Sequence, residues 1–160
     1  MTTTEPTKTS DWTFCGQPFV EAADWLGFVY VIDNVAEDRR YIGKKLLIST
    51  RMRMIKGRRR RSHRESDWRT YWGSNRHVHA DRDRLGAAAF RRQILYLVQS
   101  RGVLSYLEAR TQFEAGVLLD QARWYNGLIN CRISARHVQR IDDVACDAAL
   151  LEILTGTHRQ

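Results

Sequence analysis

Two apolar segments near the start of the chain show the clearest strand pattern. Residues 28 to 32, "FVYVI", are β-branched and aromatic, and residues 40 to 48, "RYIGKKLLI", carry a second apolar run. Such compositions are typical of strands. The polar stretch "DNVAEDRR" at 33 to 40 supplies turn residues between them. The pattern predicts a β-hairpin whose connection is longer than two residues.

A helix and a third strand are predicted next. Residues 74 to 85 suit a helix, with Ser74 as its N-cap and Gly86 ending it. The segment "AFRRQILYLV" at 89 to 98 has the composition of a strand. One face of this strand is expected to carry Phe90, Ile94, Tyr96 and Val98.

Two further helices are predicted in the second half of the chain. The first covers 102 to 119, where Ser105 and Glu108 match the S-x-x-E capping box. Its apolar stripe would consist of Leu104, Leu107, Phe113 and Leu118. An irregular turn, "RWYNGLINCRI", follows at 123 to 133. The last helix is predicted from Asp142 to Gly156.

The order of these elements favours an α+β fold. We expect a small three-stranded antiparallel sheet flanked by helices, with a basic insertion and a C-terminal helix. A length of 160 residues fits one domain. We predict a disordered tail at 1–10, an ordered lead-in at 11–26, a main domain at 27–130 and a C-terminal helical extension at 131–160.

Positive charge is concentrated in one part of the chain. The net charge is +8, and residues 39 to 64 hold 12 of the 26 lysines and arginines with no acidic residue. The remaining 14 basic and 18 acidic residues give a net charge of −4. The basic arm at 49–66 is expected to extend or flex because its charges repel one another. Such local charge indicates a polyanionic partner.

Other features exclude several classes of protein. The three cysteines, Cys15, Cys131 and Cys146, are far apart and show no CxxC spacing, which favours a reducing intracellular compartment. No cluster of cysteine and histidine suggests a metal site. The longest apolar runs are too short to span a bilayer, and "MTTTEPTKTS" lacks a signal core. We therefore expect a cytoplasmic protein.

Two short motifs give the chain a resemblance to a known family. "GFVY" at 27 to 30, ten intervening residues and "YIG" at 41 to 43 resemble the GIY-YIG nuclease signature, with Phe28 in place of isoleucine. The downstream order of helix, strand, glutamate-bearing helix and "YNG" turn agrees over about residues 27 to 130. The block "ESDWRTYWGSN" and the sequences "YIGKK" and "YNG" are most similar to phage-encoded Seg-type (SegE-like) homing endonucleases.

The resemblance implies a metal-dependent DNA endonuclease with a single Mg²⁺ or Mn²⁺ ion per site. Tyr30 matches the tyrosine that helps activate the attacking water, and Tyr41 matches the one beside the scissile phosphate. A free phenol has a pKa of about 10, so a tyrosine base needs nearby positive charge to lower it. Lys44 and Lys45 directly follow the second motif, and we expect them to supply that charge.

The resemblance also suggests a phosphate-binding arginine. Arg51 lies eight residues after Gly43, the spacing of this arginine in several family members. An arginine there could hold the phosphate with two parallel hydrogen bonds. Arg53 and Lys44 are the competing candidates. A contact to the DNA backbone, or a solvated charge, is the simpler interpretation of Arg51.

Glu108 matches the family's metal-binding glutamate. Hard divalent cations often take one carboxylate together with phosphate oxygens and water. A purely structural role in the capping box is the alternative. Counting back from "YN" instead places Thr111 at the ligand position, which would imply a weakened or dead site. Glu114 lies on another side of the same helix, so it cannot share a site with Glu108.

Asn126 matches the asparagine that closes the family's active site, with Asn130 as the weaker alternative. An Asn-Gly turn would also explain Asn126. No histidine receives a role. The expected DNA contacts include Gly43, whose missing side chain would admit close approach of the substrate. The other DNA contacts are expected from Lys45, Arg53, Lys56, Arg58, Arg59, Arg60, Arg61 and Arg64.

Three functions compete for this sequence. The leading one is the endonuclease, with DNA as partner, no small-molecule cofactor, no membrane association and a monomer or weak homodimer. If the protein is phage-encoded, it would act in the host cytoplasm. The second is a catalytically inactive basic nucleic-acid-binding module, which would need its arginines but neither Tyr30 nor Glu108. The third is a basic structural protein of a phage or ribonucleoprotein particle.

Overall fold

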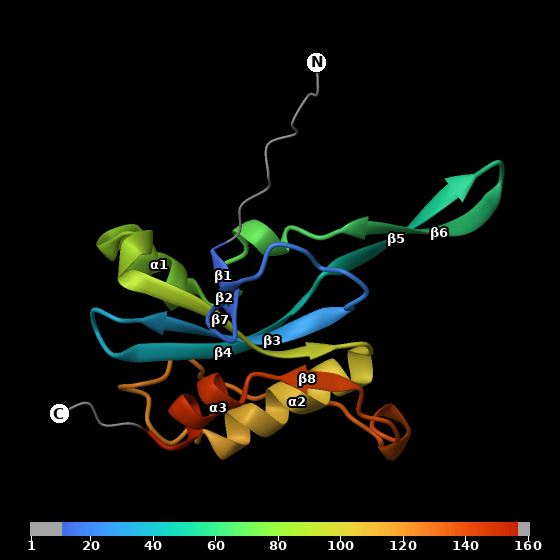
Figure 1. Cartoon of the computed structure of the whole chain (residues 1–160). Helices are drawn as coiled ribbons and strands as arrows, with labels where there is room; N and C mark the ends of the chain where they lie inside the picture. Colours follow the sequence, from blue (N-terminus) through green and yellow to red (C-terminus); the bar gives the residue numbers. More distant parts are fainter. Residues whose placement is uncertain (1–10, 157–160) are drawn as a thin grey trace.

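A mixed six-stranded sheet forms the centre of the molecule in the computed structural model, which describes residues 11–156. The tail predicted at 1–10 lies outside these residues. Helices lie on both sides of the sheet (Figure 1), and aromatic side chains fill one of its two faces. The strand order is β2 (Gln17–Pro18), β1 (Trp12–Phe14), β7 (Phe90–Val98), β3 (Gly27–Asn34) and β4 (Arg39–Leu46). Strand β8 (Asp143–Ala145) also pairs with β7.

The predicted hairpin and third strand are present, but the predicted size of the sheet is wrong. Strands β4, β3 and β7 pair antiparallel, as expected. The lead-in adds β1, which runs parallel to β7, and the C-terminal extension adds β8, which is antiparallel to it. These extra strands have only two or three residues each, too few to show an alternating pattern in the sequence. The extension is therefore part of the sheet.

A β-bulge interrupts β7. Val29 lies opposite Tyr96, but Tyr30 lies opposite Ile94, so Leu95 is an extra residue in the ladder. An extra residue exchanges the two faces of the strand beyond it. Ile94 and Phe90 consequently pack on one face of the sheet, and Tyr96 and Val98 on the other. The prediction that these four side chains share a face is wrong for this reason.

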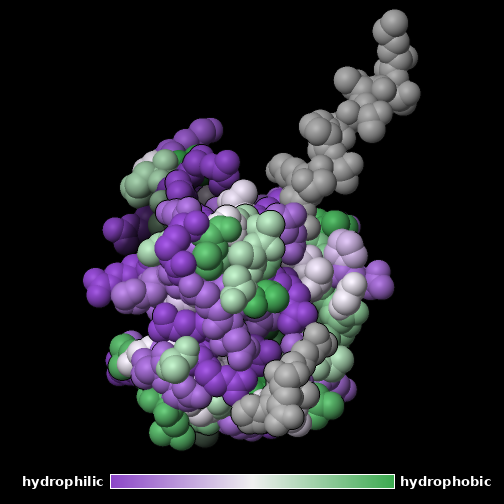
Figure 2. Space-filling model, turned by 90° about the vertical axis from the view of Figure 1, so that its left-hand side faces the viewer, coloured by the Kyte–Doolittle hydropathy of each residue, from purple (hydrophilic) through white to green (hydrophobic). Residues whose placement is uncertain are grey.

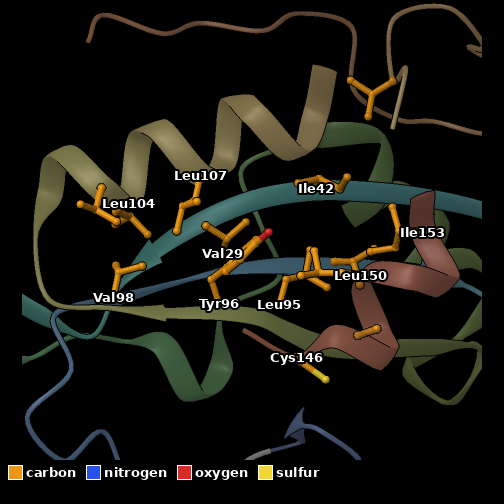
Figure 3. Packing of buried hydrophobic residues seen from close by; sticks show 14 of the residues in the cluster. Val29, Ile42, Leu95, Tyr96, Val98, Leu104, Leu107, Cys146, Leu150 and Ile153 are labelled. Carbon is orange, nitrogen blue, oxygen red and sulfur yellow. The ribbon is translucent and has the colours of Figure 1, made fainter. Parts of the chain in front are cut away.

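The first face of the sheet is aliphatic and carries two helices. Helix α2 (Arg101–Glu114) and helix α3 (Asp147–Leu154) pack there, with Leu104 and Leu107 directed at the strands (Figure 3). The remaining members of this core include Val29, Val31, Ile42, Leu95, Tyr96, Val98, Leu150 and Ile153. Because Leu150 and Ile153 belong to it, the aliphatic core ties the C-terminal segment to the sheet.

The second face is aromatic. Trp12, Phe28 and Tyr30 are buried there together with Trp68, which belongs to the short helix η1 (Trp68–Thr70). The Trp12 indole nitrogen donates a hydrogen bond to the Trp68 carbonyl oxygen at 2.8 Å. Helix α1 (Arg76–Leu85) adds Val78 to this layer. Burial on both faces explains why every residue of β3 is buried.

The structure confirms helix α1 close to its predicted span, and its N-cap lies one residue after the predicted Ser74. Asn75 is the N-cap, and its side-chain oxygen accepts hydrogen bonds from the backbone nitrogens of His77 and Val78. Gly86 ends the helix with a φ of +86°, a conformation that glycine adopts without steric cost. The short helix η2 (Ala87–Ala89) then leads into β7.

The predicted boundaries of the later helices are less accurate. Ser100 caps α2 and accepts a hydrogen bond from the Val103 nitrogen, so the predicted capping box of Ser105 and Glu108 is wrong. Helix α2 ends at Glu114, which leaves Phe113 largely exposed. The residues predicted to open the last helix form β8 instead, after the short helix η3 (Ala135–His137).

The basic arm is a regular hairpin. Strands β5 (Ile48–Ile55) and β6 (Arg58–Glu65) pair antiparallel over their whole length and project from the body (Figure 1). Lys56 and Gly57 connect them, with φ values of +48° and +73°. Positive φ at both central residues characterises the type I′ turn, whose twist suits a two-residue hairpin. The arm is extended as expected, but through pairing that the charge pattern did not predict.

The face of the molecule shown in Figure 2 is mostly polar. Hydrophilic residues cover most of the face in Figure 2, and hydrophobic residues form small separate groups on it. Among residues 11–156, no helix combines the length and the apolar composition needed to cross a membrane.

Candidate active site

An open cavity of about 460 Å³ lies along the outer edge of β4. It brings together residues from β4, from the N-terminal end of α1, from α2 and from the turn after residue 125. Four of the predicted catalytic and metal-binding residues line it: Tyr41, Lys44, Glu108 and Asn126. The complete lining adds Ser74, Asn75, Gln112, Gly127, Leu128 and Asn130.

Tyr30 lies behind this cavity and does not line it. Its side chain is only 1% exposed and contacts the rings of Trp12, Tyr71 and Tyr41, with centroid separations of 5.1, 6.0 and 6.1 Å. Burial raises the pKa of Tyr30 well above its usual value, and the neighbouring tyrosines raise it further. The phenol is therefore neutral at physiological pH in this arrangement.

Gly43 is the strand partner of Tyr30, and it makes room for the Tyr30 phenol. A β-carbon placed on Gly43 would overlap the Tyr30 hydroxyl and lie 2.7 Å from Cζ of that ring. Real side chains do not tolerate such a distance. The close approach allowed by this glycine is thus made by Tyr30, which explains why the two motifs occur on paired strands. A DNA contact of Gly43 stays a prediction.

Tyr41 is the tyrosine that faces the cavity. Its hydroxyl lies 3.2 Å from the Ser74 hydroxyl. Burial raises the pKa of Tyr41, and hydrogen bonds with Ser74 and Tyr30 only partly offset this rise. Gly73, with a φ of +81°, passes close to the ring, since a β-carbon there would lie 3.1 Å from Tyr41 Cε1. Tyr41 is therefore held between β4 and the loop that precedes α1.

The two lysines after the motif do not lower the pKa of the tyrosines, so that expectation is wrong. Lys44 Nζ pairs with Glu108 at 2.7 Å, and Lys45 Nζ pairs with Asp67 at 2.6 Å. Lys45 also lies over the Tyr71 ring, 3.9 Å from its centroid. Both ammonium groups are thus neutralised by carboxylates, and burial dominates the pKa of the phenols.

Glu108 enters the cavity from α2. Its side chain is only 15% exposed, and its Lys44 partner also donates a hydrogen bond to the Ser105 hydroxyl at 3.2 Å. Burial raises the pKa of Glu108, and Lys44 offsets that rise only in part. The carboxyl group is therefore desolvated, and its protonation equilibrium is shifted towards the neutral form. Additional positive charge nearby would shift it back towards the ionised form.

Asn126 holds the edge of β4. Its side-chain oxygen accepts a hydrogen bond from the Ile42 nitrogen at 3.0 Å, and its amide nitrogen donates to the Ile42 oxygen at 2.8 Å. Gln112 donates a second hydrogen bond to the same Ile42 oxygen at 3.0 Å. The side chain of Asn126 thus fixes the strand between Tyr41 and Gly43, and Asn126 also lines the cavity.

The alternatives on α2 and in the turn occupy other places. Thr111 is buried and donates a hydrogen bond to the Leu107 oxygen at 2.7 Å, and it does not line the cavity. Glu114 pairs with Arg110 at 2.8 Å on the exposed side of the helix. Asn130 does line the cavity, at its rim.

The arginines of the arm are not part of this cavity. Arg51 and Arg53 lie on β5, and Arg51 lines a second concave surface of about 690 Å³ at the base of the hairpin. Lys45, Arg64 and Arg101 line the same surface. Of the three candidates for the phosphate-binding cation, only Lys44 lies beside Tyr41 and Glu108.

The donor set agrees with a metal ion that is bound mainly by water and substrate. Within residues 11–156, no three side chains of histidine, cysteine, aspartate or glutamate converge on one point. Glu108 is the single carboxylate in the cavity lining. Mg²⁺ commonly accepts one or two carboxylates and completes its shell with water and phosphate oxygens. The desolvated carboxylate of Glu108 fits this requirement.

Some residues around the site were not predicted. The Ser74 hydroxyl contacts the Tyr41 hydroxyl, Gln112 donates a hydrogen bond to the Ile42 oxygen that Asn126 also binds, and Tyr71 packs on Tyr30. Arg92 is buried between the rings of Trp12 and Trp72 and donates a hydrogen bond to the Tyr71 oxygen at 2.8 Å. The aromatic block at 65 to 75 carried a signal for Tyr71, whereas nothing in the sequence marks the distant Arg92 and Gln112.

Comparison with known proteins agrees with this geometry. The family model described as "Putative endonuclease segE, GIY-YIG domain" matches residues 12–129. The match begins in β1, so it includes the lead-in, and it ends just after the turn that carries Asn126. No curated protein and no solved structure matches the chain.

Proposed function

The chain belongs to the SegE-type GIY-YIG endonuclease family, and from this membership and the cavity beside β4 we propose that it hydrolyses DNA phosphodiester bonds with one Mg²⁺ or Mn²⁺ ion. One observation carries the proposal. Tyr41 and Lys44 on β4 line a single cavity together with Glu108, which comes from the distant helix α2. A phenol, a cation and a carboxylate are the groups that phosphodiester hydrolysis needs around the phosphate.

Glu108 would hold the metal ion, with water and phosphate oxygens as the other ligands. The bound ion would supply positive charge to the phosphate and the leaving oxygen. The same charge would favour the ionised form of Glu108, whose pKa burial now raises.

Lys44 is the best-placed cation for the phosphate. Its ammonium group lies 2.7 Å from Glu108 Oε2. With Glu108 committed to a metal ion, Lys44 would be free to stabilise the negative charge that develops on the phosphate oxygens. We therefore assign to Lys44 the role for which the sequence suggested Arg51, whose side chain lies on the hairpin outside the cavity.

Tyr41 is placed to contact the attacking water or a phosphate oxygen. Its hydroxyl is neutral and lies beside Ser74 at the cavity wall. Tyr30 stands behind it, so we propose that Tyr30 acts by positioning Tyr41. A direct role of Tyr30 in activating water would require the loop at Gly73 to move away from its hydroxyl.

Plasmid cleavage tests the function. Supercoiled DNA is incubated with wild type, Glu108→Gln and Tyr41→Phe in Mg²⁺, Mn²⁺ or EDTA. The proposal expects metal-dependent nicking or linearisation by wild type and strong loss in both variants. Equal cleavage by all three proteins would contradict the assigned site, and cleavage in EDTA would contradict the role of the metal ion.

A binding module without catalysis is the second candidate, and one contact favours it. The ion pair between Glu108 and Lys44 satisfies the carboxylate without a metal ion. Wild type that binds DNA but leaves phage and bacterial genomic DNA intact in both metals would support this candidate. The family match supports the nuclease, whereas a phage-encoded homing role in the host cytoplasm stays a prediction.

A further inference from the structure

The β5–β6 hairpin has two chemically different faces. In an antiparallel pair, residues opposite each other project to the same side, and successive pairs alternate. The pairing of Arg53 with Arg60 and of Met54 with Arg59 fixes which side each residue takes. We call one side the arginine face, made of Arg51, Arg53, Arg58, Arg60 and Arg64. The other, the methionine face, carries Met52, Met54, Arg59 and Arg61.

The seven arginines of this hairpin and Lys56 have no acidic partner among the described residues. None of the ion pairs among residues 11–156 includes one of its seven arginines or Lys56. Arg53 and Arg60 lie directly opposite each other, although like charges in that position destabilise a strand pair. An arrangement that repels itself in the free protein is relieved when a polyanion binds.

The base of the arginine face continues into the body of the protein. Arg51 and Arg64 line one concave surface together with Lys45 and Arg101. Lys45 directly follows Lys44, which lines the cavity with Tyr41 and Glu108. The concave surface at the base of the hairpin, which Glu65 and Asp67 also line, and the proposed cleavage cavity therefore meet at neighbouring residues of β4.

The dimensions of the hairpin match one groove of duplex DNA. Strands of eight residues span about 26 Å, and paired strands lie about 4.8 Å apart before side chains are counted. The major groove is about 12 Å wide and admits a two-stranded ribbon, whereas the minor groove is about 6 Å wide. The hairpin also projects clear of the sheet and helices, so its tip is accessible (Figure 1).

We propose that the β5–β6 hairpin lies in the major groove of duplex DNA beside the cleavage site, with its arginine face on the base edges. The inference rests on the proposed function, because that function makes DNA the partner. Arginine forms paired hydrogen bonds with O6 and N7 of guanine in this groove. The hairpin thereby becomes a source of sequence preference, with guanine-containing steps favoured, in addition to its phosphate contacts.

Two variants with equal loss of charge test the faces. Arg53→Gln/Arg60→Gln removes two charges from the arginine face, and Arg59→Gln/Arg61→Gln removes two from the methionine face. Fluorescence anisotropy with a 30-base-pair duplex in EDTA measures binding without cleavage. We expect affinity to fall at least tenfold in the first variant and at most threefold in the second. Equal losses in two folded variants would overturn the proposal.

A competition experiment with wild type needs no variant and identifies the groove. Methyl green occupies the major groove, and netropsin occupies the minor groove of the same duplex. If methyl green displaces the protein from the duplex and netropsin does not, the proposal is supported. If netropsin displaces the protein and methyl green does not, the proposal is overturned. A duplex with 7-deazaguanine, which lacks the N7 acceptor, should bind several-fold more weakly than its guanine counterpart. Failure of plasmid cleavage would leave these binding results standing, so the two proposals fail separately.

Discussion

The β4 strand beside the cavity and the β5–β6 hairpin both carry basic residues, but these residues differ in whether a carboxylate lies next to them. In and beside the cavity, each lysine has a carboxylate within 3 Å: Glu108 for Lys44 and Asp67 for Lys45. The arginines of the hairpin have no acidic partner among the described residues. Paired charges keep a fixed geometry, whereas unpaired charges on an exposed ribbon are available to neutralise phosphates.

The difference separates chemistry from binding. Residues of the cavity are held by packing, by hydrogen bonds and by each other, so their replacement should affect the rate of cleavage more than affinity. Residues of the hairpin are exposed, so their replacement should affect affinity and its salt dependence. The following predictions sharpen this contrast, from the largest expected effect to the smallest.

The largest effect is expected for Glu108→Gln. Loss of the single carboxylate in the cavity should lower the cleavage rate by more than about 100-fold, since metal charge stabilisation is worth several kcal/mol. The Kd for duplex DNA in EDTA should change less than threefold. Glu114→Gln is the matched control, because this glutamate lies on the exposed side of the same helix and should retain full activity. A similar loss of cleavage rate in Glu108→Gln and Glu114→Gln would contradict a special role of Glu108.

Tyr41→Phe should lower cleavage by about 100-fold, the usual contribution of a group that handles a proton or a developing charge. Tyr30→Phe should have a smaller effect on the rate, because its hydroxyl is buried behind Tyr41. Single-turnover rates with saturating enzyme separate the two. If Tyr30→Phe proves the more damaging change, Tyr30 contacts the reacting atoms and the positioning role is wrong.

Gly43→Ala should destabilise the protein by about 1–3 kcal/mol, the range for overpacking a filled core. The added carbon would collide with the Tyr30 phenol on the paired strand. Gly127→Ala is the control, since its nearest neighbour would lie 4.0 Å from the new carbon. Urea denaturation followed by circular dichroism measures both, and equal stability of the two variants would contradict the close packing of Gly43.

The smallest effect concerns pH. Burial raises the pKa of Glu108 in the folded state, so the folded protein binds its proton more tightly than the unfolded chain. Stability contributed at this position is therefore greatest at low pH and declines as pH rises from the unfolded pKa through the raised folded one. The stability of wild type relative to Glu108→Gln should fall over that window in urea titrations. A rise would contradict the direction of the shift.

The sequence predicted the centre of the fold better than its borders. The long strands and α1 carry clear patterns, and the two tyrosine motifs identified β3 and β4 as the paired strands of the site. Short strands such as β1 and β8 depend on contacts with β7 that no local pattern encodes. The bulge at Leu95 also escapes prediction, because it arises from the register between two strands.

The sequence predicts several residues of the site, but it does not predict how they are arranged. Tyr41, Lys44 and Glu108 were expected, and the structure brings them together. The depth of Tyr30 and the pairing of Lys44 with Glu108 are products of packing, which spacing along the chain does not report. Arg51 shows that spacing alone can also mislead. It has the expected spacing after the motif, but it lies on a hairpin that projects from the body of the protein.

The hydrogen bonds of Asn126 have a consequence for the behaviour of the protein in concentrated solution. An outer strand such as β4 normally presents free peptide groups that invite a second chain to add a strand. The side-chain amide of Asn126 offers Ile42 the same donor and acceptor as a peptide group and so occupies that position. Replacement by aspartate would substitute an acceptor for the donor and reopen the edge. The residue that borders the cavity therefore also blocks the addition of a further strand at Ile42.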